Sequence, residues 1–200
     1  MGDDPPVGGE QHRSAGDRTD AMRVASDAEP SLTAPFPATP VLCGDGVVPP
    51  EWIDLNDHMN IGYYMLAFDR ALMRFFDLWM GLNERYVQRS GCGSFVLQSH
   101  IHYLRELRLG EPYRVDLQLL DCDAKRWHYL ASLRGGLDPD APASATCEQL
   151  AMNVDHATRR SAPLPEPERA RFEQLRAAHA ALPRPPQIGA PLGIRRPQGS

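Results

Sequence analysis

Residues 61–79 form the segment that most constrains the fold of this chain, because they read as a helix that is apolar on nearly every face. The charged side chains within it are few: Asp69, Arg70, Arg74 and Asp77. Those charges would be costly in lipid, so the segment does not predict a membrane span. A helix that is apolar almost all round belongs in a protein core. The rest of the chain must therefore cover this helix on all sides.

The boundaries of this helix are marked in the sequence. Asn60 is the expected N-cap, and Gly81 is the expected residue just beyond the C-terminus. Upstream, Val41–Val48 predicts a strand that Pro49 and Pro50 bring to an end. The helix therefore follows directly on a strand and a proline-containing turn.

The segments downstream alternate between apolar and polar residues, which predicts the β-strands that cover this helix. Four further strands are expected, at 94–107, 113–120, 126–133 and 143–154. In the first of them the alternation puts Phe95 and Ile101 on one face and His100 on the other. The connections are short, as at Asp121–Lys125, which indicates an antiparallel meander. We expect an α+β fold in which about five antiparallel strands wrap one long helix, with a C-terminal surface helix over 165–182.

Composition divides the chain into a central domain and two tails. Residues 1–40 are rich in proline and carry seven acidic residues against three arginines, which predicts a disordered tail. We expect the domain over 41–160, a helical extension over 161–182 and a flexible tail over 183–200. The net charge of −5 argues against nucleic acid or an anionic membrane as the partner. Scattered cysteines and no visible secretory signal predict a cytoplasmic protein.

Several motifs in this order resemble the hotdog fold of acyl-CoA thioesterases over residues 41–160. They are Trp52–Asn60, Tyr63-Tyr64, Ala67–Asp69, His100–Glu106, Asp121–Arg126 and Ala145–Glu148. Together they are most similar to the 4-hydroxybenzoyl-CoA thioesterase-like group and, within it, to the betainyl-CoA thioesterases of carnitine degradation. One position departs from that pattern. The family often has glycine immediately before the motif histidine, and this chain has Asp57.

The resemblance implies a reaction and a set of site residues. Asp54 would be the general base or the nucleophile that attacks a thioester, and the backbone amide of Ile61 would stabilise the oxyanion. His58 and Asn60 would orient the loop or the substrate, although a cap and a backbone contact explain them equally well. Substrate or CoA contacts would come from a wider set: Tyr63, Tyr64, Lys125 and Arg126. For both tyrosines a core position is the simpler explanation, and for Lys125 and Arg126 a solvated surface.

A metal-dependent function is suggested by another motif. His100, His102 and Glu106 resemble the first metal motif of cupins, although the second cupin motif is missing and a cupin barrel has no long buried helix. The favoured hypothesis therefore needs no metal and no cofactor. A hotdog hydratase and a non-catalytic acyl-CoA-binding regulator are also compatible with the sequence.

The expected ligand is a short or polar acyl-CoA. A betainyl group would call for aromatic walls around a quaternary ammonium. The family also implies at least a homodimer, because hotdog active sites lie between the helices and sheets of two subunits.

Overall fold

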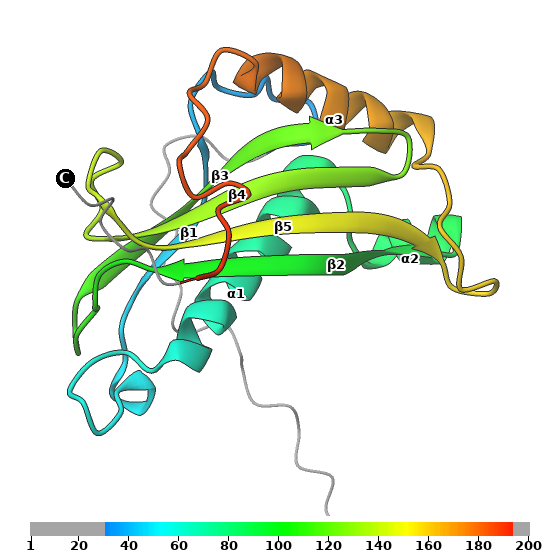
Figure 1. Ribbon diagram of the computed structural model, residues 1–200. Helices are drawn as coiled ribbons and strands as arrows, with labels where there is room; N and C mark the ends of the chain where they lie inside the picture. The colour runs from blue at the N-terminus through cyan, green and yellow to red at the C-terminus, as the bar shows by residue number, and fades with distance from the viewer. Residues whose placement is uncertain (1–30, 194–200) are drawn as a thin grey trace, which may run out of the picture.

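In a computed structural model that describes residues 31–193, five antiparallel strands form one sheet that curls around a long helix (Figure 1). In spatial order the strands are β1 (Val41–Val47), β3 (Pro112–Cys122), β4 (Arg126–Gly135), β5 (Ala143–Asp155) and β2 (Cys92–Tyr103). The helices are α1 (Ile61–Met80), α2 (Glu84–Ser90) and α3 (Glu166–His179), and a short 3-10 turn, η1 (Pro50–Trp52), precedes α1. The expected α+β architecture is confirmed, whereas α2 was not expected.

The ends of α1 lie where the capping residues predicted them. The side chain of Asn60 accepts a hydrogen bond from the N–H of Gly62, and Gly81 takes a left-handed conformation with φ of 70°. Glycine enters that region without steric cost. No helix among residues 31–193 is long and apolar enough to cross a membrane.

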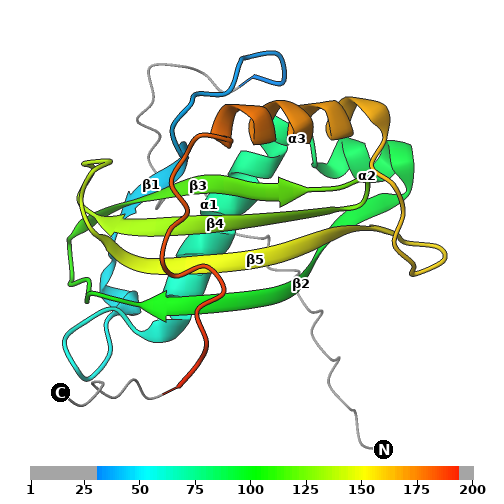
Figure 2. The same cartoon turned by 45° about the horizontal axis from the view of Figure 1, so that its top comes forward.

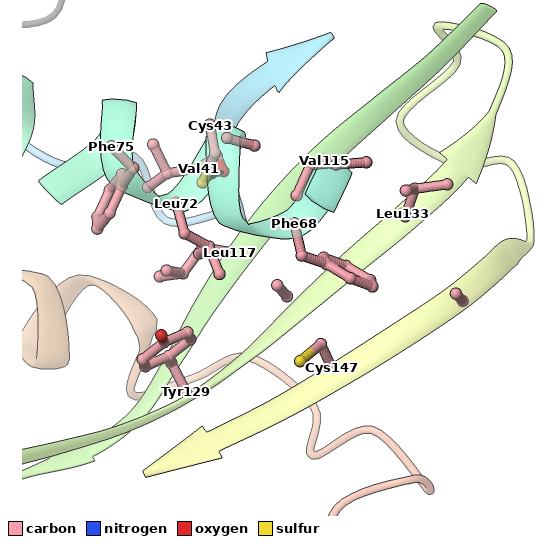
Figure 3. Close-up of a cluster of buried hydrophobic side chains, with 14 of the residues drawn as sticks. Val41, Cys43, Phe68, Leu72, Phe75, Val115, Leu117, Tyr129, Leu133 and Cys147 are labelled. Atoms are coloured by element: carbon pink, nitrogen blue, oxygen red, sulfur yellow. Dashed lines mark hydrogen bonds between the residues drawn. The ribbon is translucent and has the colours of Figure 1, made fainter. Parts of the chain in front are cut away.

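One face of α1 packs into the concave side of the sheet. Phe68, Leu72 and Phe75 point toward side chains of β3, β4 and β5, as Figure 3 shows for Leu117, Tyr129 and Cys147 among others. Burial of this apolar surface is the main force that holds helix and sheet together.

The opposite face of α1 is open, so the expectation of a helix covered on all sides is wrong for a single chain. Ile61 and Met73 on this face are 62% and 66% exposed. The neighbouring edge strand, β2, also leaves Val96 51% exposed. A five-stranded sheet covers only one side of the helix because it curls without closing into a barrel.

Strand β2 differs from its predicted alternation because it contains a β-bulge. The register with β5 shifts between Val96 and Gln98, because β2 contains one residue more than β5 over this stretch. Phe95 and Ile101 therefore lie on opposite faces of the sheet, although simple alternation puts them together. Phe95 contacts the ring of His156, whereas Ile101 packs against the core.

Helix α3 shares the hydrophobic core of the sheet, through Phe172 and Leu175. The ring of Phe172 stacks on Trp127 at 4.8 Å. The helix lies beside β3, where β1 is too short to continue the sheet (Figure 2). The expected surface helix is therefore buried along one face.

The two segments expected as tails are partly described. Residues 1–30 and 194–200 lie outside the described residues. Phe36 stacks on Trp79 at 5.5 Å, and the C-terminal segment crosses the outer face of the sheet, where the N–H of Gly189 donates to Glu148 at 2.8 Å (Figure 2).

Candidate active site

The loop between η1 and α1 is a closed turn held by backbone hydrogen bonds. Ile53 and Met59 form an isolated antiparallel bridge across its base. The N–H of Asp54 donates to the carbonyl oxygen of His58, and the N–H of Asp57 donates to that of Asp54, both at 3.1 Å. These contacts fix Asp54 at the start of the turn, just ahead of α1.

Asp57 adopts a left-handed backbone conformation, with φ of 61°. Glycine takes this conformation freely, and aspartate is among the few other residues that tolerate it. The turn therefore explains why glycine is common before the motif histidine, and why aspartate is an acceptable replacement.

The Asp54 carboxylate is held by two donors. One oxygen accepts a hydrogen bond from the N–H of Asn56 at 2.8 Å, and the other accepts from the amide nitrogen of Asn60 at 3.2 Å. The bond from Asn56 lowers the pKa of Asp54 most, burial opposes it, and Asn60 and nearby His58 lower it further. The carboxylate is therefore ionised at neutral pH, as a base or nucleophile requires.

Asn60 connects this carboxylate to the N-terminus of α1. Its side-chain oxygen accepts from the N–H of Gly62 at 3.0 Å, while its side-chain nitrogen donates to Asp54. The two hypotheses for Asn60, a cap and an orienting residue, are therefore compatible with one geometry.

The first N–H of α1 is available as a donor. Within residues 31–193 the N–H of Ile61 donates to no protein acceptor, whereas those of Gly62 and Tyr63 are bonded to Asn60. A free N–H at the positive end of a helix stabilises negative charge on an oxygen nearby. A carboxylate and an open donor therefore lie next to each other.

The aromatic residues at this end of α1 differ in their surroundings. Tyr63 is half-buried and stacks on Trp52, with ring centroids 5.4 Å apart. Tyr64 is buried, and its hydroxyl accepts from the N–H of Leu107 at 3.2 Å. His58 lies on the loop, and its Nδ1 contacts the carbonyl oxygen of Met59 at 3.3 Å.

Lys125 and Arg126 are not near this loop in the same chain. They lie at the turn between β3 and β4, at the end of the sheet opposite the loop before α1 (Figures 1 and 2). Arg126 forms an ion pair with Asp123 at 2.6 Å, and the Lys125 ammonium is 3.5 Å from the Ser161 hydroxyl.

The metal-site hypothesis is not supported by the geometry. Among residues 31–193 no group of three histidine, cysteine, aspartate or glutamate side chains could hold a metal ion. Glu106 instead pairs with Arg108. The sheet is not a closed barrel, because β1 and β2 are its two free edges. The sheet is therefore not the barrel of a cupin.

A second feature near α1 was not found in the sequence. A groove of about 580 Å³ runs between the open face of α1 and strands β2, β4 and β5. Its lining residues come from distant parts of the chain, including Met65, Phe76, Val96, Tyr129 and Gln149. Sequence spacing carries no signal for such a set, because only the packing of α1 on the sheet brings its members together.

A model of the thioesterase-like superfamily matches residues 48–172. The chain belongs to this superfamily. The resemblance to hotdog thioesterases and the expected enzyme class, a thioester hydrolase, are thereby confirmed. A betainyl-CoA thioesterase from Pseudomonas aeruginosa is 35% identical to this thioesterase over 156 residues, which make up 78% of this chain and 92% of the relative.

Other relatives of this thioesterase are fused proteins or solved structures. An L-carnitine dehydrogenase/betainyl-CoA thioesterase from Rhizobium meliloti is 30% identical, and the match covers 78% of this chain and 31% of that protein. A Staphylococcus aureus protein solved in complex with CoA superposes with a TM-score of 0.71 at 28% identity, over 78% of this chain and 98% of the other. A 1,4-dihydroxy-2-naphthoyl-CoA thioesterase from Synechocystis superposes with a TM-score of 0.56, over 64% of this chain and 92% of the other. Because the two sequences are only 15% identical, this likeness shows the fold alone.

Proposed function

We propose that this thioesterase hydrolyses a short or polar acyl-CoA to the free acid and CoA, with Asp54 as general base or nucleophile. One observation carries the proposal: Asn60 connects the ionised Asp54 carboxylate to a helix start whose first N–H is open. The N–H of Ile61 donates to the thioester oxygen as negative charge develops there. His58 and Asn60 orient the loop, and neither a metal nor a cofactor takes part.

Two routes use the same carboxylate. In the first, Asp54 takes a proton from water while the water oxygen bonds to the carbonyl carbon, and the C–S bond then breaks to release the CoA thiolate. In the second, Asp54 itself attacks and expels the thiolate, and water then hydrolyses the resulting anhydride. In both, the thiolate leaves from a carbon whose oxygen is held at the N-terminus of α1.

We further propose that the enzyme is a homodimer paired across β2. Such a pair would cover the open face of α1 and the exposed side chain of Val96. A two-fold axis beside β2 would also bring the Lys125–Arg126 turn of one copy to the same side of the assembly as the Asp54 loop of the other. This arrangement would let Lys125 and Arg126 contact the CoA phosphates.

The remaining assignments follow from burial and relatives. We assign Tyr63 to the substrate entrance, and for buried Tyr64 we propose support of the backbone at residues 105–107. The betainyl-CoA thioesterase relatives make betainyl-CoA the first substrate to test. Four unpaired cysteines suit a reducing compartment, and we place the enzyme in the cytoplasm.

The test replaces Asp54 with asparagine and measures release of free thiol from a panel of acyl-CoAs. We expect at least a hundredfold fall in kcat/KM, in the range typical for loss of a general base. Asp57→Asn is the matched control, because it removes a carboxylate from the same turn without touching the Asn60 contact. We expect it to remain within a few-fold of the parent enzyme.

Two results would count against the proposal. Undiminished turnover in folded Asp54→Asn would remove Asp54 from the chemistry. Tight binding of acyl-CoA by the parent protein without thiol release would favour the non-catalytic regulator.

A further inference from the structure

The side chain of Tyr103 lies against the first turn of α1, beside the open helix donor. Its hydroxyl donates to the carbonyl oxygen of Ile61 at 3.4 Å. The N–H of the same residue, Ile61, is the open donor of the candidate active site. Tyr103 is the last residue of β2 and is 48% exposed. A large ring therefore stands at the edge of the site, where half of its surface is not covered by the chain.

The ring of Tyr103 is held in place by a second tyrosine. It meets the ring of Tyr64 edge to face, with centroids 5.4 Å apart. Tyr64 is itself fixed, because its hydroxyl accepts from the N–H of Leu107 at 3.2 Å and donates to the carbonyl oxygen of Arg105 at 3.4 Å. Tyr103 is therefore supported at two points, by Ile61 at its hydroxyl and by Tyr64 at its ring.

The groove beside α1 begins one helical turn beyond the open donor. Met65 lines the groove and lies four residues, about 6 Å of helix, beyond Ile61. Further along, Phe76 and Tyr129 meet edge to face at 5.5 Å and add aromatic surface. Since carbon–carbon bonds are about 1.5 Å long, a butyryl chain on a thioester at Ile61 ends before Met65. An octanoyl chain that follows α1 extends into the groove.

We infer that Tyr103 limits the length of the acyl group by closing the way from Ile61 to this groove. The inference rests on the proposed function and names a residue that restricts its substrate to short acyl groups. The hydroxyl of Tyr103 contacts the carbonyl oxygen to which the N–H of Met65 bonds within α1. The ring therefore stands at the step between the open donor and the groove. A short chain leaves the ring in place, whereas a longer chain clashes with it.

The test measures kcat/KM for octanoyl-CoA relative to butyryl-CoA. The parent enzyme should favour butyryl-CoA. Tyr103→Ala should raise the octanoyl-to-butyryl ratio about tenfold, because the additional methylene groups are then buried in the groove. If Tyr103→Ala does not fold, Tyr103→Leu replaces it, because leucine shortens the side chain but keeps apolar packing at the end of β2.

Two further variants serve as controls for the ring. Tyr103→Phe keeps the ring against Tyr64 and should keep a ratio close to that of the parent. Leu104→Ala shortens the neighbouring side chain, which is 44% exposed, and should leave the ratio unchanged. A ratio that does not rise in folded Tyr103→Ala or Tyr103→Leu would overturn the inference. So would an equal rise in Tyr103→Phe.

The path of the acyl chain is tested at the mouth of the groove. Met65→Phe narrows this mouth, so in the Tyr103→Ala background it should return the ratio toward the parent value. A ratio that stays high in the double variant would overturn the assignment of the groove to the acyl chain.

Failure of the proposed function gives a different result. If neither thioester releases thiol, the proposed enzyme is refuted, and binding of octanoyl-CoA is measured by calorimetry instead. Binding that is about tenfold tighter in Tyr103→Ala than in the parent protein would still support the role of Tyr103. Equal binding by the two proteins would refute it.

Discussion

His179 offers the sharpest prediction about stability, because it takes the place of a missing strand partner. Strand β1 pairs with β3 only as far as Leu117, and beyond this the N–H of Leu119 donates to His179 Nδ1 at 2.9 Å. His179 Nε2 then donates to the carbonyl oxygen of Thr39 at 3.1 Å. The ring is 3% exposed, so both contacts are buried.

The energetic consequence of His179→Ala can be worked out from these two bonds. Each net hydrogen bond is worth about 1 kcal/mol, and a buried N–H left without an acceptor costs about 1–3 kcal/mol. We therefore expect a loss of about 3 kcal/mol in the free energy of unfolding. With a urea dependence of about 2 kcal/mol per molar, the midpoint falls by about 1.5 M.

The pH dependence has a definite sign. Burial lowers the pKa of His179, although its two backbone hydrogen bonds partly oppose the shift. Above the unfolded-state pKa of about 6.5 both states are neutral and the full stability is present. As pH falls below that value the unfolded chain binds a proton that the folded chain does not, so stability falls by up to about 1.4 kcal/mol per pH unit.

The assay is urea unfolding followed by tryptophan fluorescence between pH 8 and pH 5. His179→Ala should reduce the slope of stability with pH, and His156→Asn, which removes an exposed histidine, should keep it. If His179→Ala lowers the free energy of unfolding by less than 1 kcal/mol at pH 8 and leaves its dependence on pH unchanged, this account of His179 is refuted.

Further predictions concern the turn before α1. Asn60→Ser keeps a capping oxygen but loses the donor to Asp54, whereas Asn60→Ala loses both and should cost about 1 kcal/mol more in thermal unfolding. Hydrogen bonding lowers the pKa of Asp54, so kcat/KM should stay level until the pH falls below the usual aspartate range. Because either Asn60 variant removes one of these hydrogen bonds, kcat/KM should then begin to fall at a higher pH. An acidic limb of the pH profile that stays in place in both variants would contradict this. Asp57→Gly should raise the free energy of unfolding by roughly 0.5 kcal/mol, because glycine enters the left-handed region freely. Asp57→Ala should lower the free energy of unfolding, because alanine does not. Equal changes in the two variants would count against backbone strain at Asp57.

The local parts of the site could be predicted because they depend on short-range chemistry. Asn60 and Gly81 mark the ends of α1 through their capping geometry, and Pro49-Pro50 ends β1. Asp57 stood out as an unusual residue before His58, and the left-handed turn gives the reason. The position of Asp54 ahead of an apolar helix likewise follows from the order of residues.

Other parts of the molecule depend on contacts between residues far apart in the chain. A β-bulge in β2 reverses the faces that simple alternation assigns to Phe95 and Ile101, and only the register with β5 reveals it. His179 reaches Leu119 because β1 is short, which no local pattern in α3 indicates.

The long apolar helix, the strands around it and the acid at its start are therefore all predictable from local patterns of residues. Each of these depends on the conformational preferences of neighbouring residues. That one face of α1 stays open, with a groove beside it, becomes evident only from the packing of this helix on the sheet. A curled sheet of five strands covers only one side of a helix, and the side chains around the groove meet only once that packing has formed.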